Sequence, residues 1–80
     1  MEKKKVIRLT PDTVGRFVER ASHCDFDIDI ANTSHGRRYL VDAKSLLGVL
    51  GLDFSGNLVV TYNGENEEFE TMLDQLQIAG

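Results

Sequence analysis

The stretch LTPDTVGRF, Leu9 to Phe17, contains the first residues whose types and spacing are suited to chemistry. Thr10 is predicted to cap a helix, Pro11 fits the first helical position, and Asp12 falls in the first turn. Such a start can attract an anion, because the first backbone N–H groups of a helix have no partner within it. No His, Cys, Lys or Arg stands between Leu9 and Asp12. The stretch is therefore a working site, a lost one or only a cap.

Two other groups of side chains resemble metal or nucleophile sites only superficially. The acidic residues of DFDID, 25–29, alternate with Phe and Ile, which predicts a half-buried strand. A calcium loop would need Gly at its sixth position, where Ile30 stands. His23 and Cys24 are adjacent, but zinc needs three or four ligands, and the other His is His35. No phosphate-binding glycine loop or serine elbow occurs, so we expect no enzyme, metal or cofactor.

The stretch AKSLLGVLGL, residues 43–52, predicts a short apolar helix that starts at Ser45 and ends at Gly51. Its large apolar residues are Leu46, Leu47, Val49 and Leu50. They cannot all face inward on so short a helix. The helix is therefore either buried deep in the core or exposes an apolar docking surface beside the Ser45 hydroxyl and Lys44.

Apolar periodicity places seven elements along the chain. Strands are predicted at 4–9, 25–32, 37–43 and 58–62, and helices at about 11–23, 45–51 and 63–77. Each strand has one apolar face and each helix one apolar stripe. The order βαββαβα therefore predicts an α+β fold, an open-faced β-sandwich with a four-stranded antiparallel sheet and three helices on one face.

Composition and charge bear on the class of protein. The chain has 80 residues, which predicts one domain over residues 1–80. A single Cys, and no signal peptide or apolar run long enough to span a membrane, favour a cytoplasmic protein. All nine Lys and Arg lie at or before Lys44, whereas residues 45–80 hold six acidic residues and no basic one. This argues against direct nucleic-acid binding, and it indicates two oppositely charged surfaces or merely solvated faces of unrelated elements.

The element order and three stretches resemble the phosphocarrier protein HPr of the bacterial sugar phosphotransferase system. The stretches are AKSLLGVLGL (43–52), ASHCDFDIDI (21–30) and NGENEEFETMLDQL (63–76). The resemblance covers nearly the whole chain from about Val18 onward. Lys44-Ser45 followed by Leu-Leu-Gly is its most specific part. The resemblance implies the same open-faced sandwich that the periodicity predicts.

The resemblance also implies that the usual phosphoacceptor is missing. Family members carry phosphate on a His at the start of the first helix, in a His-Ala-Arg-Pro motif. Aligned from Ala21, that His corresponds to Thr10 and the Arg to Asp12. A threonine phosphoester is too stable to pass its phosphate onward, and Asp12 repels a phosphate where Arg would hold it. Neither His23 nor His35 falls near this position, so the resemblance implies a homologue that does not relay phosphate through the usual residue.

A second family site is retained at Ser45. Many relatives are phosphorylated there by the ATP-dependent HPr kinase and then dock onto a LacI-type transcriptional regulator. The catabolite-repression HPr paralogue also lacks the acceptor His and acts only through this Ser. The resemblance therefore implies a regulatory, protein-binding module with Ser45 as the phosphorylation site. Its docking face would comprise Arg16, Arg20, Lys44, Leu46, Leu47 and Leu50. The alternatives are a phosphocarrier with an atypical acceptor, or an interaction domain that has lost both phosphosites.

Overall fold

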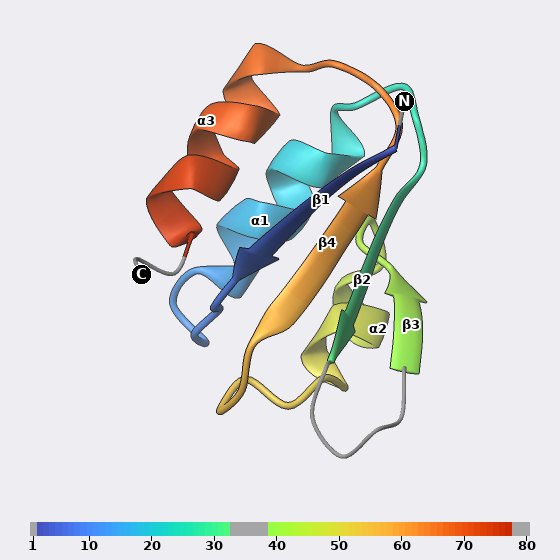
Figure 1. The fold of residues 1–80 in the computed structure, drawn as a ribbon. Coiled ribbons are helices and arrows are strands. Elements are labelled where there is room, and N and C mark those ends of the chain that lie inside the picture. Colours follow the sequence, from blue (N-terminus) through green and yellow to red (C-terminus); the bar gives the residue numbers. More distant parts are fainter. Residues whose placement is uncertain (1, 33–38, 78–80) are drawn as a thin grey trace.

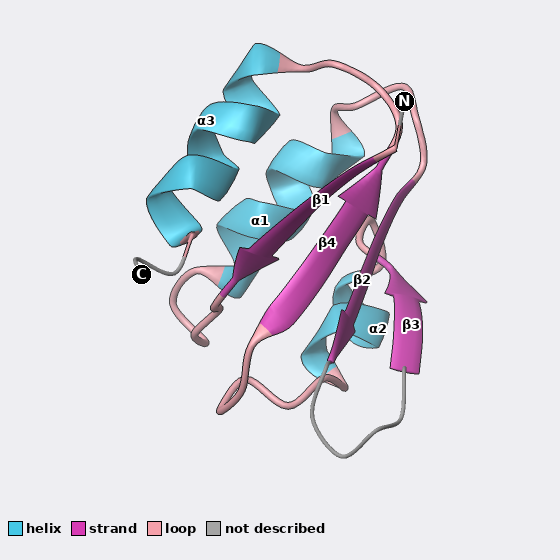
Figure 2. Ribbon diagram, viewed as in Figure 1, coloured by secondary structure: helices cyan, strands magenta, loops and turns pink. Residues whose placement is uncertain are grey.

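A computed structural model describes residues 2–32 and 39–77 of the chain. Within these residues the elements follow the predicted order βαββαβα (Figures 1 and 2). They are β1 (Lys3–Ile7), α1 (Val14–Ser22), β2 (Ile28–Asn32), β3 (Tyr39–Asp42), α2 (Leu46–Leu50), β4 (Leu58–Tyr62) and α3 (Glu67–Leu76). The two halves of the β2–β3 hairpin are present, and its turn, which includes His35, lies outside the described residues.

The strands form one antiparallel sheet in the order β1-β4-β2-β3. All three helices of the described chain lie on the same side of this sheet, and its other side carries no described element (Figure 1). Helix α1 lies between α3 and α2, so the helix layer has an α1–α3 side and an α2 end. The α+β open-faced sandwich predicted from the periodicity is confirmed.

Strand β2 and helix α3 begin later than predicted, and strand pairing explains the first difference and helix capping the second. Strand β2 was expected from residue 25 but begins at Ile28, because its partner β4 ends at Tyr62, which pairs with Ile28. The preceding Phe26 packs on Tyr62 instead, with ring centroids 6.0 Å apart. Helix α3 was expected from residue 63 but begins at Glu67, because Asn66 caps it and accepts the Phe69 N–H at 3.0 Å.

The core lies between the sheet and the helices. Helix α1 buries the stripe Val14, Phe17, Val18 and Ala21. The rings of Phe17, Phe69 and Tyr62 meet at the α1–α3 side, with centroids 6.2 Å and 5.4 Å apart in the two contacts. The Tyr62 hydroxyl donates to Glu70 at 3.1 Å, so this buried polar group is satisfied. Burial, together with that hydrogen bond, raises the pKa of Tyr62 to about 12.

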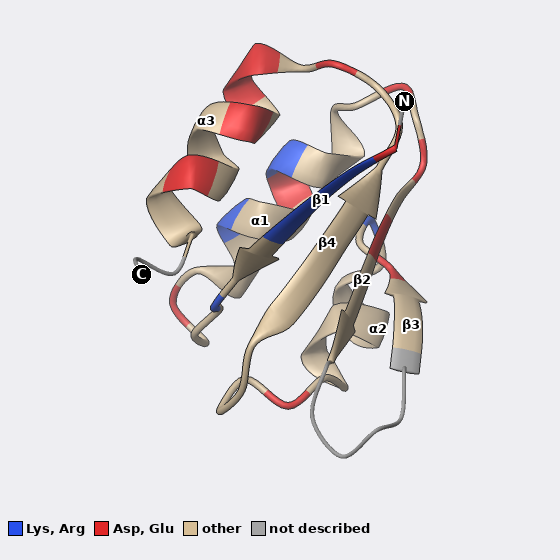
Figure 3. Ribbon diagram, in the orientation of Figure 1, with Lys and Arg blue, Asp and Glu red and all other residues tan. Residues whose placement is uncertain are grey.

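The uneven charge of the sequence holds α3 against its neighbours (Figure 3). The ion pairs are Lys3–Glu70 at 3.3 Å, Lys5–Asp74 at 3.2 Å and Arg20–Glu68 at 2.8 Å. Each joins a base of the first half of the chain to an acid of the second half. Much of the charge asymmetry is therefore neutralised across the β1–α3 and α1–α3 contacts. No helix of the described chain is long and apolar enough to cross a membrane.

Candidate functional site

The start of α1 differs from its predicted form. The regular helix begins at Val14 with Thr13 in the capping position, and the Thr13 side chain makes no capping hydrogen bond. The Thr13 hydroxyl instead accepts the Thr10 N–H at 2.9 Å and lies 3.2 Å from the Thr10 hydroxyl. The prediction that Thr10 caps the helix with its side chain is therefore wrong. Only its backbone takes part, because its carbonyl accepts the N–H groups of Thr13 and Val14 at 3.0 Å.

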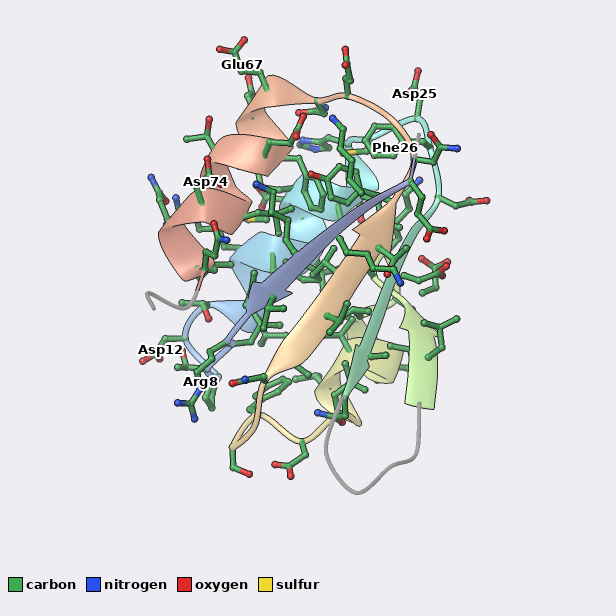
Figure 4. All side chains as sticks on the ribbon, in the orientation of Figure 1. Arg8, Asp12, Asp25, Phe26, Glu67 and Asp74 are labelled. Carbon is green, nitrogen blue, oxygen red and sulfur yellow. The ribbon has the colours of Figure 1, made fainter. Side chains whose placement is uncertain are left out.

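The turn that precedes α1 offers an anion little attraction. Residues 11–13 form a turn, and Pro11 and Asp12 are exposed. Figure 4 shows the Asp12 side chain extending from this end of the molecule into solvent, on the same side as Arg8. Arg8 is engaged elsewhere, because its guanidinium donates to the Ser55 carbonyl at 2.8 Å. The acidic Asp12 at the head of the helix opposes a second negative charge there.

The start of α2 has the predicted form. Ser45 is the N-cap, in an extended backbone conformation, and its hydroxyl oxygen accepts the Gly48 N–H at 3.2 Å. A Cβ on Gly48 would stand 3.3 Å from that oxygen, so glycine at this position allows the hydroxyl its close approach. Ser45 is exposed to solvent, and Gly51 ends the helix as predicted. The second helix therefore presents an accessible, correctly oriented hydroxyl at its first turn.

The residues of α2 separate cleanly into one anchor and an exposed apolar surface. Val49 is fully buried and holds the helix to the core. The exposed leucines are Leu46 at 45%, Leu47 at 85% and Leu50 at 48% of full exposure. These three leucines with Ser45 are called the α2 face below. Of the two possibilities that the sequence left open, the exposed surface is confirmed and deep burial of this helix is excluded.

The three basic residues assigned to the same docking face are placed differently. Arg16 donates to Gln75 at 2.9 Å and Arg20 to Glu68 at 2.8 Å, so both guanidinium groups are directed to α3. They line a groove of about 380 Å³ between α1 and α3, together with Glu67, Glu68, Thr71, Met72 and Gln75. Lys44 lies next to the α2 face, but its ammonium donates to the Cys24 carbonyl at 3.0 Å. The structure therefore brings Lys44 and the three leucines together and directs the guanidinium groups of Arg16 and Arg20 to α3.

The remaining reactive side chains of the described residues are Cys24 and His23. Cys24 is buried, its thiol contacts the Arg20 carbonyl at 3.6 Å, and burial raises its pKa, which keeps the thiol protonated and unreactive. His23 ends α1, at the opposite end of that helix from Thr10. No group of three or more possible metal ligands occurs within residues 2–32 and 39–77.

One surface escaped the sequence reasoning. Leu40 is 59% exposed and Val6 is 41% exposed, and both lie on the uncovered side of the sheet. The signal was present in the alternation of the strands. In KKVIRL, Ile7 takes the inward position, so Val6 is apolar at an outward one.

Comparison with known proteins supports the architecture. No protein-family model matches the sequence, and the search of curated proteins gives no match either. Among solved structures, the chain is similar to the phosphocarrier protein HPr from Bacillus anthracis, with a TM-score of 0.67 and 22% identity over 96% of both chains. This chain has an HPr-like fold. It is also similar to HPr-C-His from Thermoanaerobacter tengcongensis, with a TM-score of 0.66 and 27% identity over 94% of this chain and 88% of that one.

Proposed function

We propose that this HPr-like chain is a regulatory protein-binding module of the sugar phosphotransferase system, and that it acts through the α2 face rather than by relaying phosphate. The observation that carries the proposal is the α2 face itself, where an exposed capping hydroxyl stands beside leucines that are 45–85% exposed. An apolar patch next to a modifiable hydroxyl suits a partner whose binding depends on modification. The chain is therefore proposed to be a binding protein and not an enzyme.

The start of α1 supports the same proposal. The resemblance to HPr aligns residues 10–13 with the stretch that holds the phosphohistidine in HPr proteins, and here these residues are Thr, Pro, Asp and Thr. Phosphoryl relay needs a nucleophile whose phosphate is labile and a positive charge to hold it. The Thr10 hydroxyl is engaged with Thr13, and Asp12 brings a negative charge. Neither residue supplies what relay requires.

Phosphorylation of Ser45 would change the α2 face in a defined way. The hydroxyl now accepts one backbone N–H, from Gly48, and a phosphate would bring three acceptor oxygens and about −2 charge to the same turn. The added charge would stand beside an otherwise uncharged run of leucines. A partner with a basic group next to an apolar pocket would then recognise the modified face. The proposed partners are HPr kinase and a LacI-type transcriptional regulator.

Phosphorylation by HPr kinase with ATP tests the proposal. We expect the wild-type chain to gain one acid-stable phosphate and Ser45→Ala to gain none. Ser55→Ala is the matched control, because Ser55 is also an exposed loop serine but belongs to the loop between α2 and β4, and this variant should be labelled like the wild type. Equal labelling of the wild type and Ser45→Ala would contradict the role of Ser45.

One alternative has support in the fold. An HPr-like chain that keeps its carrier activity would need another acceptor, and His23 is exposed. His23 is at the C-terminal end of α1, and the resemblance places the family phosphosite at the other end of that helix, so its use would require a different docking geometry. Incubation with phosphoenolpyruvate and enzyme I separates the two functions, since only a carrier gains an acid-labile phosphate.

A further inference from the structure

The uncovered side of the sheet carries an apolar row that runs across all four strands. Val6 of β1 pairs with Val59 of β4, Val59 with Ala31 of β2, and Ala31 with Leu40 of β3. Because neighbouring residues in register lie on the same side of a sheet, the four side chains form one continuous line. The ends of the row are its exposed members, Val6 at 41% and Leu40 at 59%, whereas Ala31 between them is only 4% exposed. A sheet surface that faces water would ordinarily carry polar residues at such outward positions.

The neighbouring row on the same side is charged, and its charges are opposite at its two ends. Lys4 of β1 pairs with Thr61 of β4, Thr61 with Asp29 of β2, and Asp29 with Asp42 of β3. The row therefore begins with a positive charge on one edge strand and ends with negative charges on β2 and β3. Lys4 and Asp42 are both exposed, and neither has an ion-pair partner among the described residues.

These two rows together are self-complementary. A two-fold axis parallel to the strands, running between β4 and β2, exchanges β1 with β3 and β4 with β2. It places Val6 of one copy over Leu40 of the other, so the apolar rows meet. The same operation places Lys4 over Asp42 twice, once on each side of the axis. We propose that the uncovered sheet face binds a second copy of this chain across such an axis.

The geometry of the fold agrees with this occupant. Two sheets that pack face to face lie about 10 Å apart and keep their strands within about 30°, which a twisted four-stranded sheet allows. The footprint of four strands of about five residues is roughly 300 Å² per copy. Since stable complexes bury about 800 Å² per partner, the association is weak and expected at high micromolar concentration. The helices lie on the other side of the sheet, so both α2 faces remain exposed in the pair (Figure 1).

The charge pattern allows a test in which two weakened variants restore each other. Lys4→Glu paired with itself opposes acid to acid at both contacts, and Asp42→Lys paired with itself opposes base to base. When one copy of each variant pairs, both contacts again join opposite charges. At one contact the introduced Glu meets the introduced Lys, and at the other the unchanged Asp42 meets the unchanged Lys4. We expect sedimentation velocity up to about millimolar concentration to show wild-type dimers, at least a tenfold weaker association of each variant alone, and recovery to within about threefold of wild type in the mixture.

Changes in fold cannot account for that pattern. Asp42→Lys removes the hydrogen bond from the Lys44 N–H to the Asp42 carboxylate, 2.9 Å in this structure, but the same protein is present alone and in the mixture. Leu40→Asp should abolish association, and circular dichroism should show its fold intact. Leu47→Asp, which changes an exposed leucine of the α2 face, should leave association unchanged.

Three results would overturn the proposal. They are a wild-type chain that stays monomeric at millimolar concentration, a mixture no tighter than its components, and association that Leu47→Asp abolishes but Leu40→Asp does not. The last result would assign self-association to the α2 face instead. A monomeric chain whose Leu40→Asp variant alone fails to bind HPr kinase or the regulator would assign the sheet face to a different protein.

Discussion

The α1–α3 side and the α2 end of the helix layer differ in whether their surface side chains have partners within the chain. On the α1–α3 side, Arg16 and Arg20 donate to Gln75 and Glu68, so the basic side chains of α1 have partners within the chain. At the α2 end, three leucines are exposed and only Val49 of the five-residue helix, all of it described, is buried. On the α1–α3 side the polar groups are therefore paired within the chain, whereas no described segment covers the leucines of α2. This difference supports the proposal that the α2 face, rather than the α1–α3 side, is the surface that binds a partner.

The largest expected difference between α1 and α2 is in how much stability their buried side chains contribute. Phe17→Ala removes a fully buried ring of α1, and we expect it to lower the free energy of unfolding by about 3–5 kcal/mol. Val49→Ala removes two methyl groups beneath α2, and the expected loss is about 2 kcal/mol. Urea denaturation of both variants measures the losses. A loss at Val49 as large as that at Phe17 would contradict the view that α2 is lightly anchored.

The exposed leucines of α2 should matter for binding to the regulator but not for stability. Leu47 is 85% exposed, so Leu47→Asp should change the free energy of unfolding by no more than about 0.5 kcal/mol. The same substitution should weaken binding of the Ser45-phosphorylated chain to the LacI-type regulator at least about tenfold. Calorimetric titration measures this affinity. Thr71→Asp is the control, because Thr71 is an exposed residue of α3 that lines the groove between α1 and α3. Equal weakening of binding by both variants would mean that the partner does not bind specifically at the α2 face.

The two helix starts should differ in what their hydroxyls contribute to stability. Ser45→Ala removes the capping bond to Gly48, and we expect a loss of about 1 kcal/mol in the free energy of unfolding. Thr10→Ala removes only the exposed contact with the Thr13 hydroxyl and should cost a few tenths of that amount. Ser45→Asp keeps an oxygen that can accept the same N–H, so it should restore most of the loss. A larger loss of unfolding free energy for Thr10→Ala than for Ser45→Ala would contradict the assignment of Ser45, and not Thr10, as a capping side chain.

The smallest expected effect is a pH dependence of stability that arises from Glu70 of α3. Partial burial acts to raise the pKa of Glu70, but the hydrogen bonds from Lys3 and Tyr62 outweigh it and lower the pKa below its ordinary value. A lowered folded-state pKa means that the unfolded chain binds a proton first as pH falls. Glu70 therefore stabilises the fold above about pH 4.3, and its contribution is lost as pH falls through the folded pKa.

Acid unfolding of Glu70→Gln measures that contribution. The variant cannot ionise at this position, so its stability should fall less steeply than that of the wild type below about pH 4.3. Identical profiles for Glu70→Gln and the wild type would show that the Lys3–Glu70–Tyr62 contacts do not stabilise the α1–α3 side.

The sequence predicted the architecture well, because apolar periodicity reports directly which face of each element is buried. The stripe Val14, Phe17, Val18 and Ala21 and the cap at Ser45 were both correctly predicted. Element ends were predicted less well. The start of β2 depends on where the neighbouring strand β4 ends, at Tyr62. That position is set by pairing between segments that are distant in the sequence.

The candidate site was predicted only in part, for a related reason. The leucines of α2 could be recognised because a five-residue helix cannot bury them all. Arg16 and Arg20 could not be placed, because the acceptors that direct them, Gln75 and Glu68, are more than 45 residues away in the chain. The register that aligns Val6 with Leu40 likewise depends on strand order, which the sequence does not display.

The central claim is that this HPr-like chain binds partners through Ser45 and does not carry phosphate from the start of α1. Intact mass spectrometry after incubation with phosphoenolpyruvate, enzyme I and the wild-type chain tests this most directly. An active HPr protein in the same mixture serves as the positive control. We expect the control to gain one acid-labile phosphate and this chain to gain none. An acid-labile phosphate on this chain, on Thr10, His23 or any other residue, would contradict the account.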